Sequence, residues 1–292
     1  MSLKTRVRGE ASGLAHQGTR VAREAATSPA METLMRLGYI VRGLVYGAIG
    51  VLAVQAAFAK GGSLTDTQGA IVALGTTPLG SILLYAILVG LIGYGLWGIV
   101  RAIFDPLHKG TDLKGIGERV GFAVSGISYG LLALATYGLI TGAANAAHNG
   151  AQTTQAQDAT ASIMSNSWGA IAVGIVGVLV IGLGLLQIVQ GVRREFERQF
   201  DPYALSSTQR AWIDRMGRFG MAARGLVFAM IGLFLILAAY HHDPSQAQGI
   251  NGVLAALLQQ PYGPWLLGIV ALGLIAFGIY SAMCGIWLRF KR

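Results

Sequence analysis

The sequence carries little charge for its length. Only 12% of its 292 residues are Asp, Glu, Lys or Arg, whereas about a quarter of the residues in a soluble domain are charged. Hydrophobic residues make up 53% of the chain. This composition argues against a soluble globular domain and indicates an integral membrane protein.

Carboxylates are absent from the apolar parts of the chain. Each of six apolar runs has about twenty residues, the length that crosses a bilayer core as a helix, and none contains Asp or Glu. The runs do not alternate polar and apolar residues as membrane β-strands do. Ion-coupled pumps usually place an acid inside a span, so its absence counts against such transport. The runs cover 39–58, 79–104, 120–139, 168–189, 221–240 and 265–288.

The sequence also lacks the usual signatures of catalysis. Its one cysteine, Cys284, excludes an intramolecular disulfide and leaves the compartment undetermined. No nucleophile–base set, P-loop or dinucleotide fingerprint is present, so we expect no enzyme, no catalytic residue and no cofactor. His241, His242 and Asp243, with His148, could collect a metal. Adjacent histidines lack the geometry of a helical site, so we expect loop polarity and no metal.

What the chain has in abundance is glycine, 42 residues, and a motif that occurs three times. The copies RLGYIVRGLVYG, RVGFAVSGISYG and RFGMAARGLVFA begin at Arg36, Arg119 and Arg218. Each copy opens an apolar run, so the chain predicts three copies of a two-span unit. The expected divisions are a basic arm at 1–35 and repeats at 36–110, 111–205 and 206–292.

The distribution of positive charge predicts the topology. Lys and Arg lie in the first 42 residues and at 101–119, 193–224 and 289–292, while the other three connections hold only Lys60. This positive-inside pattern predicts a multi-pass protein of the cell membrane with both termini in the cytoplasm. It also accounts for the net charge of +9 without a nucleic-acid partner. We expect anionic phospholipid to be a partner of this basic side.

The repeats predict the fold class. All three begin on the same side, so they are parallel repeats. We expect an all-α integral membrane protein with six transmembrane helices, arranged as a pseudo-threefold bundle with short outer helices. Pairs such as Gly43 and Gly47 allow close helix approach, which favours association in lipid. An oligomer is compatible with this arrangement.

The outer connections share a polar pattern at matching places. A Thr or Ser is followed three residues later by Gln, the form of a capping box in which the hydroxyl caps a helix and the Gln returns a bond. Each box predicts the start of a short outer helix. The expected structural caps are Thr65 with Gln68, Thr154 with Gln157, and Ser245 with Gln248.

The inner segments also predict helix starts. Ser28 and Pro29 suit the N-cap and first helical position of a helix that leads into the first span. Asp-Pro pairs at 105–106 and 201–202 predict short interfacial helices, the second of which carries Trp212 at the headgroup level.

The triple pattern resembles a bacterial integral-membrane family known as domain of unknown function 1206. The three motif copies and the Phe-Asp-Pro segments at 104–106 and 200–202 carry the resemblance, which covers about 36–290. It implies a prokaryotic membrane protein with three tandem two-span units and supplies no activity. Ser125 stands where the other repeats have Arg42 and Arg224, which counts against a role that needs three equivalent arginines.

Arg42 and Arg224 are candidate functional residues because a charge inside a membrane is costly. They lie four to six residues into the spans, a depth of about 6–9 Å that a snorkelling side chain can bridge. One interpretation is structural anchoring, with pairing to Asp105 or Asp201, and the other is binding of an anion or lipid headgroup. Further candidates for lipid or anion binding are Arg36, Arg119 and Arg218.

Two functions from different classes remain open. Polar side chains in the spans, such as Tyr46, Tyr94, Gln187 and Ser281, either hydrogen-bond helix to helix or line a pore; the first is commoner. The first function is a non-enzymatic scaffold or regulator that contacts anionic lipid or partner proteins. The second is a passive channel or facilitator for a small solute along the pseudo-threefold axis. A continuous polar lining along this axis would favour the second.

Overall fold

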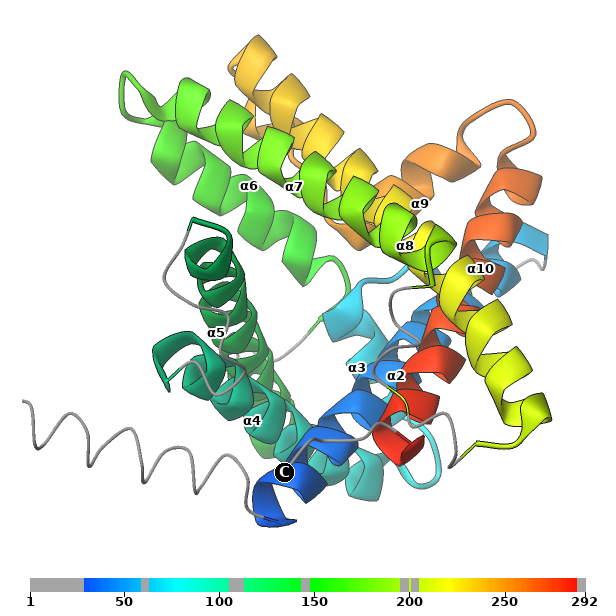
Figure 1. The fold of residues 1–292 in the computed structure, drawn as a ribbon. Helices are drawn as coiled ribbons and strands as arrows, with labels where there is room; N and C mark the ends of the chain where they lie inside the picture. Colours follow the sequence, from blue (N-terminus) through cyan, green and yellow to red (C-terminus); the bar gives the residue numbers. More distant parts are fainter. Residues whose placement is uncertain are drawn as a thin grey trace, which may run out of the picture.

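The computed structural model describes residues 29–58, 63–104, 113–142, 148–194, 200 and 205–287. Six long helices dominate this part of the chain (Figure 1). Short helices precede the second span of each repeat. The long helices are α2 (Pro29–Phe58), α4 (Gly80–Phe104), α5 (Leu113–Thr141), α7 (Gly169–Val192), α8 (Ser207–His241) and α10 (Gly263–Trp287); the short ones are α3 (Thr67–Gly75), α6 (Ala151–Met164), the 3-10 turn η2 (Pro244–Gln246) and α9 (Ile250–Leu258).

The six long helices are membrane spans by length and composition. They have between 24 and 35 residues, and each contains a strongly apolar window. A helix satisfies all its backbone hydrogen bonds internally, which is what a segment in lipid requires. The all-α, six-span prediction is confirmed, and the chain is a multi-pass membrane protein.

The spans pack most extensively between repeats. The first span of each repeat lies along the second span of the preceding one, which gives the pairs α2–α10, α4–α5 and α7–α8. Glycines allow this approach: a Cβ on Gly225 of α8 would lie 2.5 Å from the backbone oxygen of Gly184 in α7. The other two pairs have the same contact, between Gly43 and Gly278 and between Gly126 and Gly95.

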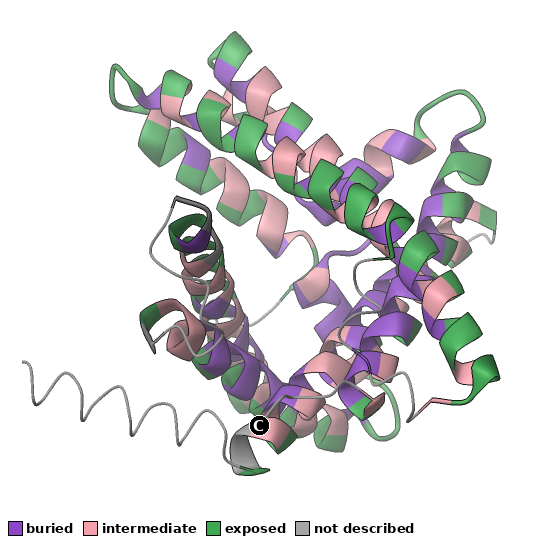
Figure 2. Ribbon diagram, viewed as in Figure 1, coloured by how far each residue is buried: buried purple, intermediate pink, exposed green. Residues whose placement is uncertain are grey.

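Packing within the repeats is uneven. In repeats 1 and 3 the two spans also contact each other, as α2–α4 and α8–α10, whereas α5 and α7 of repeat 2 pack elsewhere. Buried residues accordingly gather on α2, α3 and α10, while α5 and α7 are mostly exposed or intermediate (Figure 2). The three helix pairs repeat, but the bundle around them is not closed equally on all sides.

The short helices exist, but the predicted capping boxes are wrong. In repeat 1 the N-cap of α3 is Asp66, one residue after Thr65, and its carboxylate accepts the Gly69 N–H at 2.9 Å. Gln68 lies buried in the first turn of α3 instead of closing a box on Thr65. A carboxylate binds the helix N-terminus more strongly than a hydroxyl because it also complements the helix dipole.

The boxes of the other two repeats are displaced from the helix starts. Thr154 and Gln157 lie inside α6, which begins after Gly150 without a side-chain cap. Ser245 lies in η2, and its N–H and hydroxyl donate to the Asp243 carboxylate. The α9 helix begins after Gly249, while Gln248 donates back to the Ser245 carbonyl.

A capping box does occur at the start of α8, where none was predicted. Ser206 accepts the Gln209 N–H, and the Gln209 side chain accepts the Ser206 N–H. From there α8 runs unbroken through Trp212 to His241, so the separate interfacial helix expected to carry Trp212 is absent. The described part of α2 starts at Pro29. Ser28, the Asp-Pro pairs and residues 1–28 of the arm expected at 1–35 lie outside the described residues, so the helix start at Ser28 and Pro29 stays a prediction.

The short helices are joined to one another by polar contacts between repeats. The second oxygen of the Asp66 carboxylate accepts the Gln152 N–H of α6 at 2.9 Å. On the other side of α6, Thr153 donates its hydroxyl to Asn251 and accepts the Gly249 N–H at 2.9 Å. The N-terminal turns of α3, α6 and α9 are therefore held together on the face opposite the start of α2.

A candidate anion site between the helix pairs

Arg42 of α2 lies against α10 and is surrounded by aromatic rings. Its Nε donates to the Ser281 hydroxyl at 2.9 Å, and that hydroxyl donates to the Tyr39 carbonyl at 2.9 Å. The guanidinium carbon lies 4.8 Å from the Tyr39 ring centroid and 5.2 Å from that of Phe277. These distances allow cation–π attraction, which partly replaces the hydration that the cation loses.

Arg224 of α8 has the same arrangement in the neighbouring helix pair. Its Nε donates to the Tyr46 hydroxyl at 3.0 Å, and its Nη1 donates to the Gln187 side-chain oxygen of α7. The guanidinium carbon lies 4.4 Å from the Phe228 ring centroid and 5.0 Å from that of Phe277. Gln187 lies three residues after Gly184, the glycine at which α7 closely approaches α8. Ser281, the partner of Arg42, likewise lies three residues after Gly278 of α10.

Arg101 of α4 supplies a third cation from the remaining helix pair. Its guanidinium carbon lies 4.2 Å from the Phe122 ring centroid of α5 and 5.5 Å from that of Trp97. Its Nε is buried and has no hydrogen-bond partner in the part of the chain that the structure describes. An unpaired buried donor is costly, so the described contacts leave the hydrogen bonding of Arg101 incomplete.

Two aromatic rings connect the three arginines into one cluster. Arg42 and Arg101 both lie 5.9 Å from the Tyr94 ring centroid. Arg42 and Arg224 share Phe277, as described above. Each helix pair thus contributes one arginine, although only two occupy the same position of the repeat. We call Arg42, Arg101 and Arg224 the arginine cluster.

The arginine cluster holds positive charge without a described counter-ion. The ion pairs within the described ranges join other residues, Arg36 to Glu32 and Asp214 to Arg194 and Arg218. A guanidinium has five N–H donors, and the described contacts use only some of them. All three residues are of intermediate burial in the bundle. Asp105 and Asp201, the acids expected to pair here, lie outside the described residues.

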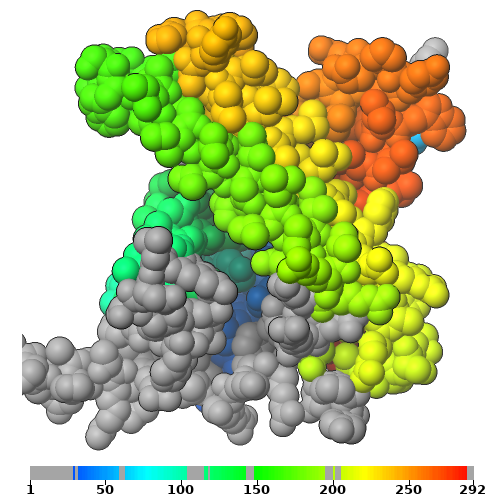
Figure 3. All heavy atoms as spheres, turned by 45° about the horizontal axis from the view of Figure 1, so that its top comes forward, coloured from blue at the N-terminus to red at the C-terminus, as the bar shows by residue number. Residues whose placement is uncertain are grey.

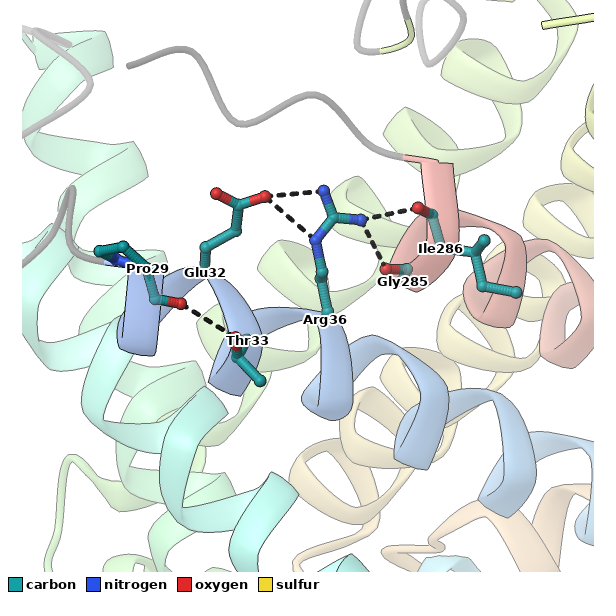
Figure 4. Close-up of polar contacts among 6 residues, drawn as sticks. All are labelled: Pro29, Glu32, Thr33, Arg36, Gly285 and Ile286. Atoms are coloured by element: carbon teal, nitrogen blue, oxygen red, sulfur yellow. Dashed lines mark hydrogen bonds and ion pairs between the residues drawn. The ribbon is translucent and has the colours of Figure 1, made fainter. Parts of the chain in front are cut away.

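The arginines that open the repeats serve a different purpose. Arg36 donates to the backbone oxygens of Gly285 and Ile286 at the end of α10, and its other N–H groups contact Glu32 (Figure 4). Arg119 likewise donates to the carbonyls of Ala102 and Ile103 at the end of α4. Both therefore cap the C-terminus of the paired helix, where a cation is favourable.

Arg218 is the third of these motif arginines. It is exposed and lies 4.0 Å from Asp214. Its backbone oxygen lies against Gly191 near the end of α7, so it holds the equivalent place in its helix pair. Lipid binding by Arg36, Arg119 and Arg218 remains a prediction, and helix capping already accounts for the positions of the first two.

Three of the polar residues expected to join helices do so. Tyr46, Gln187 and Ser281 each bond an arginine of another helix, which confirms the helix-to-helix interpretation for these three. Arg101 was missed as a site residue because it lies near the end of its span, where a cation is typical of a topology signal. The aromatic residues Tyr94 and Trp97 on the same helix were the available signal.

The histidines of the short connections form no metal site in the described part of the chain. The Nδ1 atom of His241 lies 2.9 Å from the Gln246 side-chain oxygen. The Asp243 carboxylate accepts hydrogen bonds from the Ser245 hydroxyl and N–H and from the Gln246 amide, and these bonds hold its pKa below the ordinary value. Asp243 thus caps η2.

Comparisons with known proteins agree with the repeat structure. The family model described as Domain of Unknown Function (DUF1206) matches three times, at residues 37–105, 120–194 and 219–287. An uncharacterized protein of Bacillus subtilis (strain 168), YxxB, is 35% identical over 261 residues, which cover 89% of this chain and 92% of the relative. No solved structure matches.

Proposed function

The chain belongs to the family described as Domain of Unknown Function (DUF1206), whose model it matches in all three repeats, and we propose that it binds the phosphate of an anionic phospholipid through the arginine cluster. It would do so without catalysing a reaction, as a scaffold or regulator in the membrane. The chemistry of the cluster and its depth in the bundle support this proposal.

One observation carries the proposal: three arginines, one from each helix pair, share aromatic rings, and none has a carboxylate among its described partners. Like charges near one another in a low dielectric repel and resist burial. A bound anion lowers that cost. The guanidinium fork matches two oxygens of a phosphate, and the surrounding rings hold the arginine planes in place.

The depth of the cluster suits a lipid headgroup. Gln187, the partner of Arg224, lies five residues before the end of α7. Arg101 lies three residues before the last described residue of α4, and Ser281, the partner of Arg42, lies six before that of α10. At the rise of an α-helix these positions are about 4–9 Å inside the described helix ends. A lipid phosphate drawn slightly into the bundle would reach this level.

The channel alternative receives less support from the described residues. A channel needs polar groups along its whole length. Between the arginine cluster and the short helices, Ile49 and Ala53 of α2 and Ala271 and Leu274 of α10 are fully or almost fully buried. Ile71 of α3 and Leu254 of α9 pack into the same apolar core. We therefore propose the lipid-binding function alone.

Native mass spectrometry of the purified protein tests the proposal. The wild type should retain phosphatidylglycerol in preference to phosphatidylcholine. The double change R42Q and R224Q should weaken phosphatidylglycerol binding at least tenfold, because each lost charge-assisted hydrogen bond is worth about 1.5–3 kcal/mol. R215Q is the control for single charge removal, because Arg215 is exposed on the same helix as Arg224.

The lipid-binding comparison is valid only for variants that are folded. All variants should elute as one species in detergent, and R42K, which keeps the charge, should keep part of the preference. Equal phosphatidylglycerol binding by the wild type and the folded R42Q/R224Q variant would overturn the proposed function. A loss of binding in R215Q as large as in the double variant would also overturn it, since surface charge would then suffice.

A further inference from the structure

Equivalent positions of the three repeats differ in burial on their first spans. Val41 of α2 and Ala223 of α8 occupy the same position of the motif and are 2% and 8% exposed. The equivalent residue of α5, Val124, is 59% exposed. One helical turn further on, Val45 and Val227 are buried, whereas Ser128 is exposed. The face of α5 that should enter the bundle is therefore uncovered.

The second spans show the same difference. Tyr94 of α4 and Phe277 of α10, the two rings that join the arginine cluster, are 8% and 3% exposed. Their equivalent on α7 is Leu183, which is 57% exposed. Two turns away, Ile87 and Val270 are buried, whereas the equivalent Val176 is exposed.

The difference is confined to one face of α7. Leu96 of α4, Leu185 of α7 and Ile279 of α10 occupy another equivalent position, and all three are exposed. That position faces outward in every repeat. Leu183 therefore lies on the face of α7 whose equivalents are buried in repeats 1 and 3, whereas Leu185 lies on the face that is exposed in all three repeats.

An opening between α5 and α7 explains these observations. The two helices do not pack on each other as the spans of repeats 1 and 3 do. Figure 1 shows the pair α4–α5 set apart from the pair α7–α8, with the short helix α6 between α5 and α7 in this view. In Figure 3 the molecule is hollowed beside α7, and atoms of the blue segment, α2, lie at the floor of the hollow.

The two helices that flank the opening also reach the arginine cluster. Tyr129 of α5 has its ring centroid 4.5 Å from that of Tyr94, which contacts two of the arginines. On the other side of the opening, Gln187 of α7 accepts a hydrogen bond from Arg224. The helices that flank the opening therefore also contribute residues to the walls of the site.

We propose that an acyl chain of the bound phospholipid lies between α5 and α7, against Val124, Val176 and Leu183, while its phosphate contacts the arginine cluster. This inference rests on the proposed function and deepens it, because it assigns a lipid and not a free anion as the ligand. A second copy of the chain fits the opening less well, because each copy has a formal net charge of +9 and would bring no excess anion to the cluster.

Two tryptophan variants on α7 test the position of the acyl chain. L183W places a large ring in the opening, and L185W places the same ring on the face exposed in all repeats. L183W should bind phosphatidylglycerol about tenfold more weakly than L185W in native mass spectrometry, because the ring takes the place of several buried methylene groups. Equal binding by the two variants overturns the acyl-chain position, whatever the arginine variants show.

Competition with a headgroup that has no acyl chains separates the two proposals. Glycerophosphoglycerol at millimolar concentration should displace little phosphatidylglycerol from the wild type. If it displaces the lipid completely at a concentration near that of the lipid, the arginine cluster binds a free phosphate diester and the acyl-chain inference is wrong.

If R42Q/R224Q retains phosphatidylglycerol while L183W loses it, the proposed function fails and the opening binds lipid by its chains alone. The oligomeric state of the two variants gives a further test. If L185W self-associates while L183W stays monomeric, a second copy of the chain occupies the opening and the inference is overturned.

Discussion

At the scale of single residues, the repeated arginine and the buried acid have the clearest roles. Arg36 and Arg119 each reach the last carbonyls of a helix from another repeat. Helix capping therefore explains why the first two copies of the motif open with arginine. Asp66 is fully buried and bonds the first turns of both α3 and α6. These residues have structural roles and are not part of the arginine cluster.

Loss of the Arg119 cap should destabilise the protein. R119A removes two hydrogen bonds to the carbonyls of Ala102 and Ile103 at the end of α4. We expect a cost of about 1–3 kcal/mol, because each such bond contributes roughly 0.5–1.5 kcal/mol. Thermal unfolding in detergent measures this, with R215A as the charge-matched control. Equal melting temperatures of R119A and R215A would contradict the capping role.

Asp66 should matter more than any of the hydroxyls expected to cap helices. D66A leaves the N–H groups of Gly69 and Gln152 without their acceptor, and we expect a loss of about 2–4 kcal/mol from a buried cap shared by two helices. T154A should stay within about 0.5 kcal/mol of the wild type, as exposed substitutions usually do, because Thr154 is exposed within α6. Thermal melting of the two variants side by side decides between Asp66 and the hydroxyls.

At the scale of helices, close contacts between glycines hold the pairs together. The close contact of Gly184 with Gly225 recurs in the other two pairs. Small residues let the backbones approach, so that dispersion contacts along the whole interface stabilise the pair in lipid. The two spans of repeat 2, α5 and α7, do not pack on each other as the spans of repeats 1 and 3 do.

Two glycines on α7 provide a matched test of this packing. A Cβ at position 184 would lie 2.5 Å from the Gly225 oxygen, whereas one at position 182 would meet nothing within 4 Å. G184A should therefore force α7 from α8 and cost about 1–3 kcal/mol, as overpacking does. G182A should be neutral or stabilising by up to about 1 kcal/mol, because Ala has the higher helix propensity. Equal melting temperatures would show that the pair tolerates a wider separation.

At the scale of the whole molecule, the predicted topology places the basic ends of the spans in the cytoplasm. The described arginines gather where α2, α5 and α8 begin and where α4 and α7 end, and the short helices lie at the opposite ends. The proposed lipid would then come from the cytoplasmic leaflet, where anionic lipids attract basic segments. Orientation is therefore part of the functional hypothesis.

Labelling of introduced cysteines measures the orientation. Q155C in α6 should react with a membrane-impermeant maleimide in intact cells, because the positive-inside pattern puts this connection outside. T208C at the start of α8 should react only after the cells are opened. Both positions are exposed, so accessibility within the protein does not limit the reaction. The reverse pattern would place the termini outside and exclude the cytoplasmic leaflet as the lipid source.

The sequence alone determined the six spans, the three repeats and the family. These features depend on hydropathy over about twenty residues and on a motif that can be aligned with itself, so no contact between distant residues is needed to see them. The same local information identified Arg42 and Arg224 as unusual charges and Tyr46, Gln187 and Ser281 as polar groups inside spans. It indicated the short helices, but not which side chains begin them.

The tertiary structure decided which of these residues meet. Arg36 contacts a helix end 249 and 250 residues away, and Arg101 joins Arg42 only because α4 and α2 bring both side chains to Tyr94. Asp66 caps α3 in place of Thr65, and its second oxygen also reaches α6. Hydropathy cannot encode such partners, because the spans are all similarly apolar and the free energy that selects helix pairs comes from close packing and a few polar contacts between repeats. The opening between α5 and α7, on which the proposed acyl-chain position depends, arises at this level alone.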